Sequence, residues 1–358
     1  MSILDNLDNY DSLDNETAQT GGEPSRRSLK KIALAFIAVL LVGLIAGVVT
    51  NFILDKESSS KAKPKKSSSS AAGNQSTSTA SGARPKQPVT LTFSTPQAMS
   101  HVYALSDQIG PRKAGSLKES GAADYIVGKL GEYGYTVEEQ PFTMSDGFGS
   151  RNVVGTSRGT REGYTIVIAA HYDSPAASPG ADDNGTGVGV VLELARVFSQ
   201  VKGLEPTLQF AFFGANRPGD SSVDNRLDGS RRYVDLLGTL QKKDVVGMIA
   251  VDSVGKGEVL ALRTQGTGLQ RLSDKLATFA AGKNIAVTAL KSREDSDNIP
   301  FENSQIPAVW VEWCDQDGSL STDNLYSGVD AGKVEAAGSL IESFMKNLSS
   351  QDLEELKY

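Results

Sequence analysis

The sequence predicts an α/β protein: a three-layer sandwich with a mostly parallel central sheet, preceded by one transmembrane helix. Short apolar runs alternate with segments of helical periodicity through residues 89–358, the order expected of a sheet covered on both sides. Two of these runs, Ile166–Ala170 and Val245–Val251, are continuous, which is typical of strands buried on both faces. A longer apolar run at residues 32–54 has the length of a bilayer-spanning helix.

Four segments of different composition follow one another along the 358 residues. Residues 1–31 are acidic and polar with a basic end and lack a sustained period, so we expect a disordered tail. Residues 32–54 are predicted to be an uncleaved anchor, because the tail before them is too long for the n-region of a signal peptide. Residues 55–88 are rich in Ser and Lys and are expected to form a flexible stalk, and residues 89–358 form the globular domain.

The apolar spacing assigns the elements of the globular domain in order. Helices are predicted where apolar residues recur every three or four positions, at Pro96–Ile109, Ser116–Tyr133, from Val188 to Phe198, Leu269–Gly282 and Ala331–Leu348. Strands are predicted at the short apolar or alternating runs Tyr135–Phe142, Asn152–Thr156, Tyr164–Ala170, Thr207–Phe213, Val245–Val251, Glu258–Leu262, Ala286–Leu290 and Ala308–Trp313.

Composition excludes one class of partner and limits the possible metal ligands. The formal net charge is −7, the pI is near 5.1, and no basic face with interleaved aromatic residues is present, so we expect no nucleic-acid partner. Cys314 is the one cysteine, so an intrachain disulfide is impossible and the redox compartment stays open. The chain has two histidines, His101 and His171, which limits the imidazoles available to a metal.

Polar side chains follow two of the predicted central strands. His171 comes directly after Ile166–Ala170, Asp183 follows a loop, and Asp252 ends the strand Val245–Val251. Open α/β sheets place their ligands at these carboxyl ends, and imidazole and carboxylate are both zinc ligands. Asp173 could accept the second ring N–H of the histidine and fix its tautomer. The alternative is a polar loop with a surface histidine that binds no metal.

The same stretch resembles the signature of the di-zinc aminopeptidase family. His171-Tyr-Asp-Ser is followed by Gly180-Ala-Asp-Asp-Asn-Gly-Thr-Gly, and the resemblance extends from about Val102 to Leu348. That family includes bacterial leucyl aminopeptidases and aminopeptidase S, with glutamate carboxypeptidase II, the transferrin receptor ectodomain and glutaminyl cyclases as relatives. Further matching segments are Asp107–Arg112, Asn152–Gly155, Phe210–Gly214, Asp228–Tyr233 and Ser296–Phe301. The resemblance implies a zinc-exopeptidase fold.

The resemblance also implies a role for each residue of one half of a metal site. In the family, two zinc ions share a bridging aspartate, and each ion has a further histidine and carboxylate. His171 matches the first histidine, Asp183 the bridging carboxylate and Asp252 the second carboxylate of the same ion. Asp173 matches the carboxylate that orients the histidine. The resemblance therefore implies that His171, Asp183 and Asp252 can hold an ion.

The other half departs from the family pattern at the general base and its neighbouring ligand. The family has Glu-Glu after the strand that is Phe210–Phe213 here, whereas this chain has Asn216 and Arg217. An asparagine is no proton acceptor at neutral pH, and an arginine stays protonated and binds no zinc. Asp220 and Asp224, in the loop that follows, are weak candidates for a substitute carboxylate.

The second histidine of the family is also missing. Ser319 or Leu320 stands at its position near the C-terminus, and Asn298 replaces the histidine of a Ser-Asp-His stretch. His101 is the one other imidazole in the chain, and it lies on the first predicted helix, where a surface or packing role is expected.

These departures favour a membrane-anchored domain of the aminopeptidase family with lost or much reduced activity, acting as a binding or scaffold module. The alternative is a single-zinc metallopeptidase that uses His171, Asp183 and Asp252 with an open fourth position. Cyclase-type transferase chemistry needs the same missing residues. We expect at most one zinc ion, or none, and a peptide or protein ligand.

The membrane topology is left open by charge, because basic residues flank both ends of residues 32–54. The stalk and the family resemblance favour an extracytoplasmic domain on a single-pass cell-membrane anchor.

Overall fold

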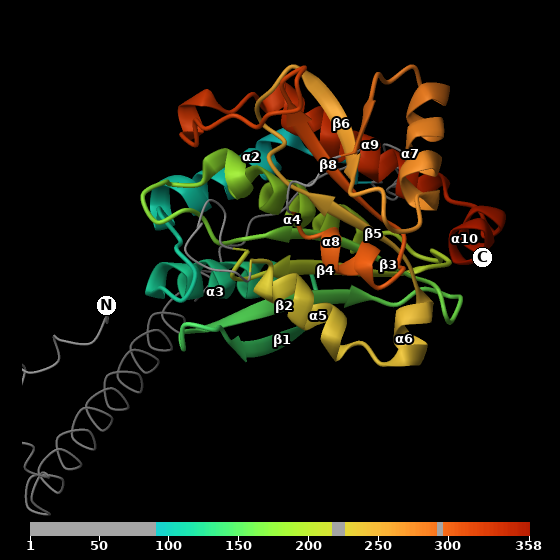
Figure 1. The fold of residues 1–358 in the computed structure, drawn as a ribbon, viewed down its shortest axis with the longest axis horizontal. Helices are drawn as coiled ribbons and strands as arrows, with labels where there is room; N and C mark the ends of the chain where they lie inside the picture. The colour runs from blue at the N-terminus through green and yellow to red at the C-terminus, as the bar shows by residue number, and fades with distance from the viewer. Residues whose placement is uncertain (1–90, 217–225, 292–295) are drawn as a thin grey trace, which may run out of the picture. The chain divides into compact units, whose positions relative to one another are not determined.

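The strands of the described residues form one eight-stranded sheet (Figure 1). The computed structural model describes residues 91–216, 226–291 and 296–358. The strand order across the sheet is β1-β2-β4-β3-β5-β8-β6-β7. The strands are β1 (Thr136–Thr143), β2 (Gly149–Ser157), β3 (Thr165–His171), β4 (Thr207–Phe213), β5 (Val245–Val251), β6 (Val259–Thr264), β7 (Thr288–Lys291) and β8 (Ala308–Cys314).

The centre of the sheet is parallel, and an antiparallel pairing joins it to each flank. Strands β4, β3, β5 and β8 run parallel, whereas β2 is antiparallel to both β1 and β4, and β6 is antiparallel to β8. The turn of residues 144–148 between β1 and β2 is too short for the crossover that parallel strands require. The segment 252–258 between β5 and β6 is also short, and β6 pairs antiparallel with β8. The prediction of a mostly parallel sheet therefore holds for the centre, and the sheet as a whole is mixed.

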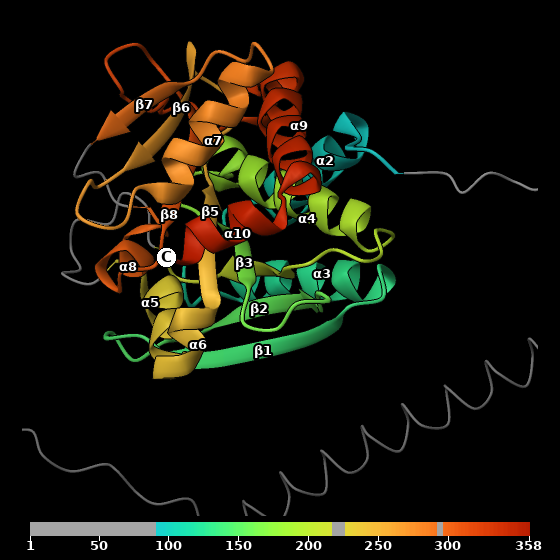
Figure 2. The ribbon, with the colours of Figure 1, turned by 90° about the vertical axis from the view of Figure 1, so that its right-hand side faces the viewer.

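Helices cover both faces of the sheet, which gives the three predicted layers (Figures 1 and 2). One apolar core joins the sheet to six helices: α2 (Thr95–Tyr103), α3 (Leu117–Glu132), α4 (Gly187–Phe198), α7 (Arg271–Gly282), α9 (Ala331–Asn347) and α10 (Ser350–Lys357). A smaller core on the opposite face is closed by α5 (Asp228–Leu236) and α8 (Ile299–Asn303). The short helix α6 (Thr239–Asp244) precedes β5.

Helix α4 lies at the centre of the larger core. Every residue of α4 except Arg196 is buried, because the helix packs between the sheet and the helices α2 and α9. Its one buried acid, Glu193, pairs with Arg196 at 2.6 Å and accepts a hydrogen bond of 2.7 Å from the amide of Ser94. Gly189 allows α2 to approach closely, since a Cβ at this position would lie 2.7 Å from the carbonyl oxygen of Ala98.

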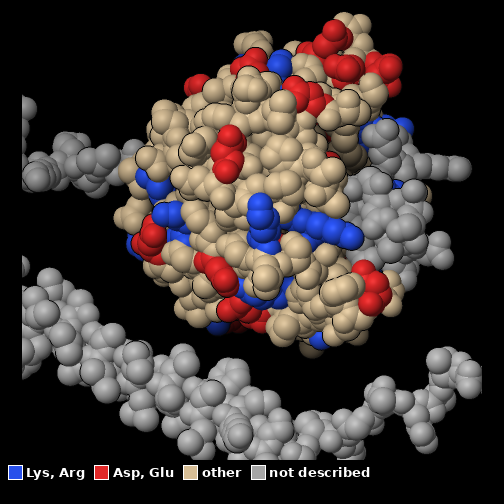
Figure 3. All heavy atoms as spheres, turned by 90° about the vertical axis from the view of Figure 1, so that its left-hand side faces the viewer, with Lys and Arg blue, Asp and Glu red and all other residues tan. Residues whose placement is uncertain are grey.

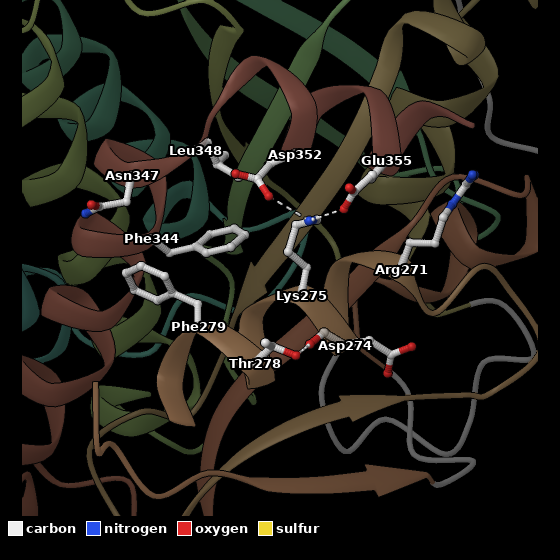
Figure 4. A pocket seen from close by; sticks show the side chains of 10 residues that line it. All are labelled: Arg271, Asp274, Lys275, Thr278, Phe279, Phe344, Asn347, Leu348, Asp352 and Glu355. Carbon is white, nitrogen blue, oxygen red and sulfur yellow. Dashed lines mark hydrogen bonds and ion pairs between the residues drawn. The ribbon is translucent and has the colours of Figure 1, made fainter. Parts of the chain in front are cut away.

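Helices α7, α9 and α10 line a surface pocket of about 560 Å³ (Figure 4). Phe279 of α7 and Phe344 of α9 meet edge to face with their ring centroids 5.5 Å apart. Lys275 of α7 lies 2.7 Å from a carboxylate oxygen of both Asp352 and Glu355 of α10. These contacts fasten α10, a helix that was not predicted, to α7.

The predicted tail, anchor and stalk, residues 1–31, 32–54 and 55–88, lie outside the described residues. Within residues 91–216, 226–291 and 296–358, no helix combines the length and the apolarity that crossing a bilayer requires.

A substitution at Gly189 tests the packing of α4 against α2. Gly189→Val places side-chain atoms against the backbone of Ala98, which cannot move aside, so we expect the free energy of unfolding to fall by about 1–3 kcal/mol. Gly128→Ala on α3 is the matched control, because a Cβ there meets nothing within 4 Å, and we expect it to stabilise by about 0.5–1 kcal/mol. Urea unfolding measures both; an unchanged stability of Gly189→Val contradicts the packing described.

Candidate metal centre

Two strand ends and one turn bring His171, Asp183 and Asp252 to one point at the carboxyl edge of the sheet. His171 is the last residue of β3 and Asp252 directly follows β5, which is the parallel neighbour of β3. Asp183 lies in the irregular turn η2 (Ala181–Thr186) that leads into α4. The ends of adjacent parallel strands meet at one edge of a sheet, so the strand pairing itself places the imidazole beside Asp252.

The geometry of this group suits one metal ion. Nε2 of His171 lies 3.2 Å from Oδ1 of Asp183 and 3.5 Å from Oδ2 of Asp252. One ligand atom from each of the three residues lies within 4.8 Å of the other two. The side chains of His171 and Asp252 are 1% and 9% exposed, whereas that of Asp183 is 26% exposed, so the group opens to solvent on the Asp183 side. One imidazole and two carboxylates form a ligand set that zinc accepts.

Asp173 lies beside the ring nitrogen of His171 that faces away from Asp183 and Asp252. Its Oδ1 lies 3.4 Å from Nδ1 of His171, and the Asp173 side chain is fully buried. The same oxygen accepts a hydrogen bond of 2.9 Å from the amide of Asn216. Nδ1 of His171 has no hydrogen-bond partner among the described residues, so Asp173 acts on the imidazole through its charge, and its predicted role in orienting the ring stays a prediction.

The electrostatics of the group favour a cation. Burial alone lowers the pKa of His171, but the carboxylates of Asp252, Asp173 and Asp183 outweigh it and hold that pKa well above its usual range. Burial raises the pKa of Asp183, and His171 opposes this shift. The carboxylates that gather around one imidazole attract positive charge, and a divalent cation suits such a site.

The position expected for a general base carries a buried amide. Asn216 follows β4 after Ala215, whose φ of 55° turns the chain toward the site. Asn216 is 5% exposed, and its Nδ2 is buried without a hydrogen-bond partner. Arg217, Asp220 and Asp224 lie outside the described residues.

The other replaced positions are occupied by residues that serve the fold. Ser319 is exposed and donates a hydrogen bond of 2.7 Å to Asp317, and Leu320 packs against the smaller apolar core. Asn298 is buried and donates a hydrogen bond of 2.7 Å to Glu302. In the part of the chain that the structure describes, His171, Asp183 and Asp252 are the group of ligand-type side chains close enough to share an ion.

His101 takes the packing role expected of it. Its side chain is buried between α2 and α3, with Nδ1 2.6 Å from the hydroxyl of Tyr125 and Nε2 3.2 Å from the hydroxyl of Tyr133. Burial lowers the pKa of His101 to about 4. The imidazole therefore joins two helices as a neutral group.

Arg112 supports the site, and sequence analysis gave it no role. The guanidinium is fully buried and donates hydrogen bonds to the carbonyl oxygens of Tyr172 at 2.8 Å, Pro179 at 2.6 Å and Gly180 at 2.9 Å. Burial lowers the pKa of Arg112 to about 10, while Asp173 and Asp183 act in the opposite sense. Arg112 thus ties together the loop between the histidine and the second ligand, and its positive charge offsets the carboxylates.

Two hydroxyls fix the third ligand. The carboxylate of Asp252 accepts hydrogen bonds from Ser253 Oγ at 3.0 Å and from Ser296 Oγ at 2.8 Å. Asn184, next to Asp183, donates to the carbonyl oxygen of Val251 at 2.9 Å. The strand end and the turn η2 are therefore joined directly.

Comparison with known proteins agrees with this geometry. The sequence profile of Peptidase family M28 matches residues 152–338, more than half of the chain, and the chain therefore belongs to this family.

Leupeptin-inactivating enzyme 1 of Streptomyces exfoliatus is 29% identical over 233 residues, covering 63% of this chain and 47% of that protein. Aminopeptidase YwaD of Bacillus subtilis is 30% identical over 172 residues, covering 46% and 36%. The human BOS complex subunit NCLN is 33% identical over 140 residues, covering 35% and 24%. The chain spans about half or less of the length of these relatives.

Solved structures share the fold. A zinc aminopeptidase from Bacillus subtilis superposes with a TM-score of 0.65 at 18% identity, covering 73% of this chain and 98% of that one. The glutaminyl cyclase of Porphyromonas gingivalis gives a TM-score of 0.61 at 23% identity, covering 71% and 98%. The α/β fold with a mixed sheet is thus that of zinc aminopeptidases and of a cyclase alike.

Replacing Arg112 tests its support of the site. Arg112→Met leaves several buried carbonyl groups without a donor, each costing about 1–3 kcal/mol, so we expect the free energy of unfolding to fall by at least about 3 kcal/mol. Arg158→Met removes an exposed arginine and is expected to change stability by about 0.5 kcal/mol or less. Equal stabilities of the two variants in urea unfolding contradict this role.

Proposed function

We propose that this chain is a membrane-anchored M28 domain that holds at most one zinc ion on His171, Asp183 and Asp252 and binds a peptide or protein with little or no hydrolysis. The observation that carries the proposal is Asn216, a buried amide where the family pattern has a glutamate. Residues 32–54 serve as the anchor, and the described domain lies outside the cytoplasm.

The chemistry of Asn216 favours binding over hydrolysis. Attack of water on a peptide bond needs a proton acceptor within hydrogen-bond reach, and an amide does not accept that proton at neutral pH. The amide can instead donate a hydrogen bond. A buried N–H group without a partner costs about 1–3 kcal/mol, which a ligand oxygen placed against Nδ2 of Asn216 would recover.

The three ligand residues give the site its cation chemistry. A zinc ion held by them would act as a Lewis acid toward a bound carbonyl group. Asp173 keeps the imidazole of His171 oriented, and Ser253 and Ser296 hold the carboxylate of Asp252. Asp183 is the exposed member of the group and marks the side from which a ligand reaches the site.

The relatives support both a binding role and a catalytic one. The human relative is named as a subunit of the BOS complex, which agrees with a scaffold role. Leupeptin-inactivating enzyme 1 and aminopeptidase YwaD are named as enzymes, which supports the alternative of a single-zinc metallopeptidase. The observation that favours this alternative is the set of three ligands with an open side at Asp183, since a catalytic zinc keeps a fourth position free.

We propose no nucleic-acid partner. The net charge of the chain is −7, and the face shown in Figure 3 carries basic and acidic side chains interspersed among uncharged ones. A protein that tracks a phosphate backbone needs a basic stripe or patch.

Metal content and peptidase activity test the proposal together. We expect the full-length chain, purified in detergent, to contain at most one zinc per chain by elemental mass spectrometry and to cleave aminoacyl anilides little or not at all. His171→Ala should abolish the zinc, and Ser321→Ala, in the loop that carries Ser319 and Leu320, should leave it unchanged. Robust cleavage by the wild type that a chelator and His171→Ala both abolish refutes the binding role and establishes the hydrolase.

Restoring the missing groups tests the correspondence with the family pattern. Asn216→Glu with Arg217→Glu, combined with either Ser319→His or Leu320→His, should raise the zinc content above that of the wild type, because carboxylate and imidazole donors replace an amide and a guanidinium. The pair Asn216→Gln with Arg217→Gln is the control that adds no ligand. If neither histidine position gives a gain, the assignment of residues 319 and 320 is wrong.

A further inference from the structure

One residue of the C-terminal loop holds the turn that carries Asp183. The side-chain oxygen of Asn324 accepts hydrogen bonds from the amides of Asp182 at 3.1 Å and Asp183 at 2.7 Å. The main-chain oxygen of Asn324 accepts a third from the amide of Ala181 at 3.0 Å. Three consecutive amides of η2 therefore donate hydrogen bonds to Asn324, a residue more than a hundred positions away in the sequence.

This contact matters because Asn324 is the acceptor for the amides of residues 181–183, whereas the rest of the turn is held by Arg112, Asn184 and Thr186. Asp183 has φ −103° and ψ 94°, outside the helical region, and the turn begins after Gly180, which has a left-handed φ of 60°. Asp183 is also the most exposed of the three ligands, whereas His171 ends a strand and Asp252 is held by two serines. The position of Asp183 thus depends on the acceptors of Asn324 more than the other two ligands do.

The loop that carries Asn324 is itself fixed to the sheet. Nζ of Lys256 lies 2.5 Å from Oδ2 of Asp323, next to Asn324. At the start of the same loop, Arg263 of β6 donates a hydrogen bond of 2.6 Å to the carbonyl oxygen of Gly318. One contact comes from β6 and the other from the segment just before it, so the loop is held near both of its ends.

We propose that Asn324 is a positioning residue for the metal centre: its acceptors hold the amides of residues 181–183 and thereby set the carboxylate of Asp183 for the ion. The inference rests on the proposed single-zinc site. It makes the loop of residues 315–325, which carries Ser319 and Leu320 in place of a ligand, a determinant of zinc affinity without supplying a donor atom. A residue of this kind orients a ligand through the backbone, and losing such outer contacts typically weakens metal binding about 10- to 100-fold.

Three variants of the full-length chain test the proposal, with zinc alone as the probe. Asn324→Ala removes the side-chain acceptor, Asn324→Asp keeps an oxygen in the same place, and Asn347→Ala removes an exposed asparagine of α9. Zinc affinity is measured by competition with a chromophoric chelator. Amide hydrogen exchange of residues 181–183 is measured by mass spectrometry in the metal-free protein, and circular dichroism confirms that each variant is folded.

We expect Asn324→Ala to bind zinc about 10- to 100-fold more weakly than the wild type and to exchange the amides of residues 181–183 faster. Asn324→Asp should restore both properties, and Asn347→Ala should change neither. Wild-type affinity in a folded Asn324→Ala, or unchanged exchange at residues 181–183, overturns the positioning role while leaving the single-zinc site in place. A wild-type chain that binds no zinc overturns this inference, whereas the proposed binding role without hydrolysis remains.

Discussion

The close approach of carboxylates to one buried imidazole is the constraint on which the rest of the site depends. Asp183 and Asp252 both lie within 3.5 Å of Nε2 of His171, and Asp173 lies 3.4 Å from the other ring nitrogen. Carboxylates repel one another strongly in a buried site, where the effective dielectric constant is low. The protein offsets this repulsion with the imidazole itself, with the buried guanidinium of Arg112 and with hydrogen bonds, and a cation would complete the balance.

The sheet fixes two of the three residues of the candidate metal centre, whereas the third, Asp183, lies in the turn η2. His171 and Asp252 stand at the ends of β3 and β5, where the pairing of the central strands places them. Asn216 and Leu320 stand on loops, where a change of residue leaves the sheet intact. Membership of Peptidase family M28 therefore establishes the fold, whereas activity has to be argued residue by residue.

The elements with a continuous apolar pattern were predictable from the sequence, and so was the meeting of His171, Asp183 and Asp252 beside them. The strand Val245–Val251 has the predicted bounds, and Asp173 lies against the imidazole as expected. The helices α5, α6, α8 and α10 were not predicted, because they are five to nine residues long and bury few side chains each. The antiparallel flank at β6 was missed because short loops leave no periodic signal.

The residues that support the site could not be found from sequence spacing. Arg112 and Asn324 act through backbone carbonyl and amide groups of a loop far from them along the chain. The segment ending in Arg112 matched the family, but an arginine in a loop resembles a surface charge until the fold buries it. The Thr-Asp-Asn sequence before Leu325 likewise resembles an ordinary polar loop. Its role follows from the hydrogen bonds that Asn324 accepts from three backbone amides.

Anomalous diffraction at the zinc edge, from crystals grown with excess zinc, tests the account most directly. The account predicts one peak, bounded by His171, Asp183 and Asp252, with the amide of Asn216 beside it. Two peaks bridged by Asp183, with a carboxylate poised over the water between them, would contradict it.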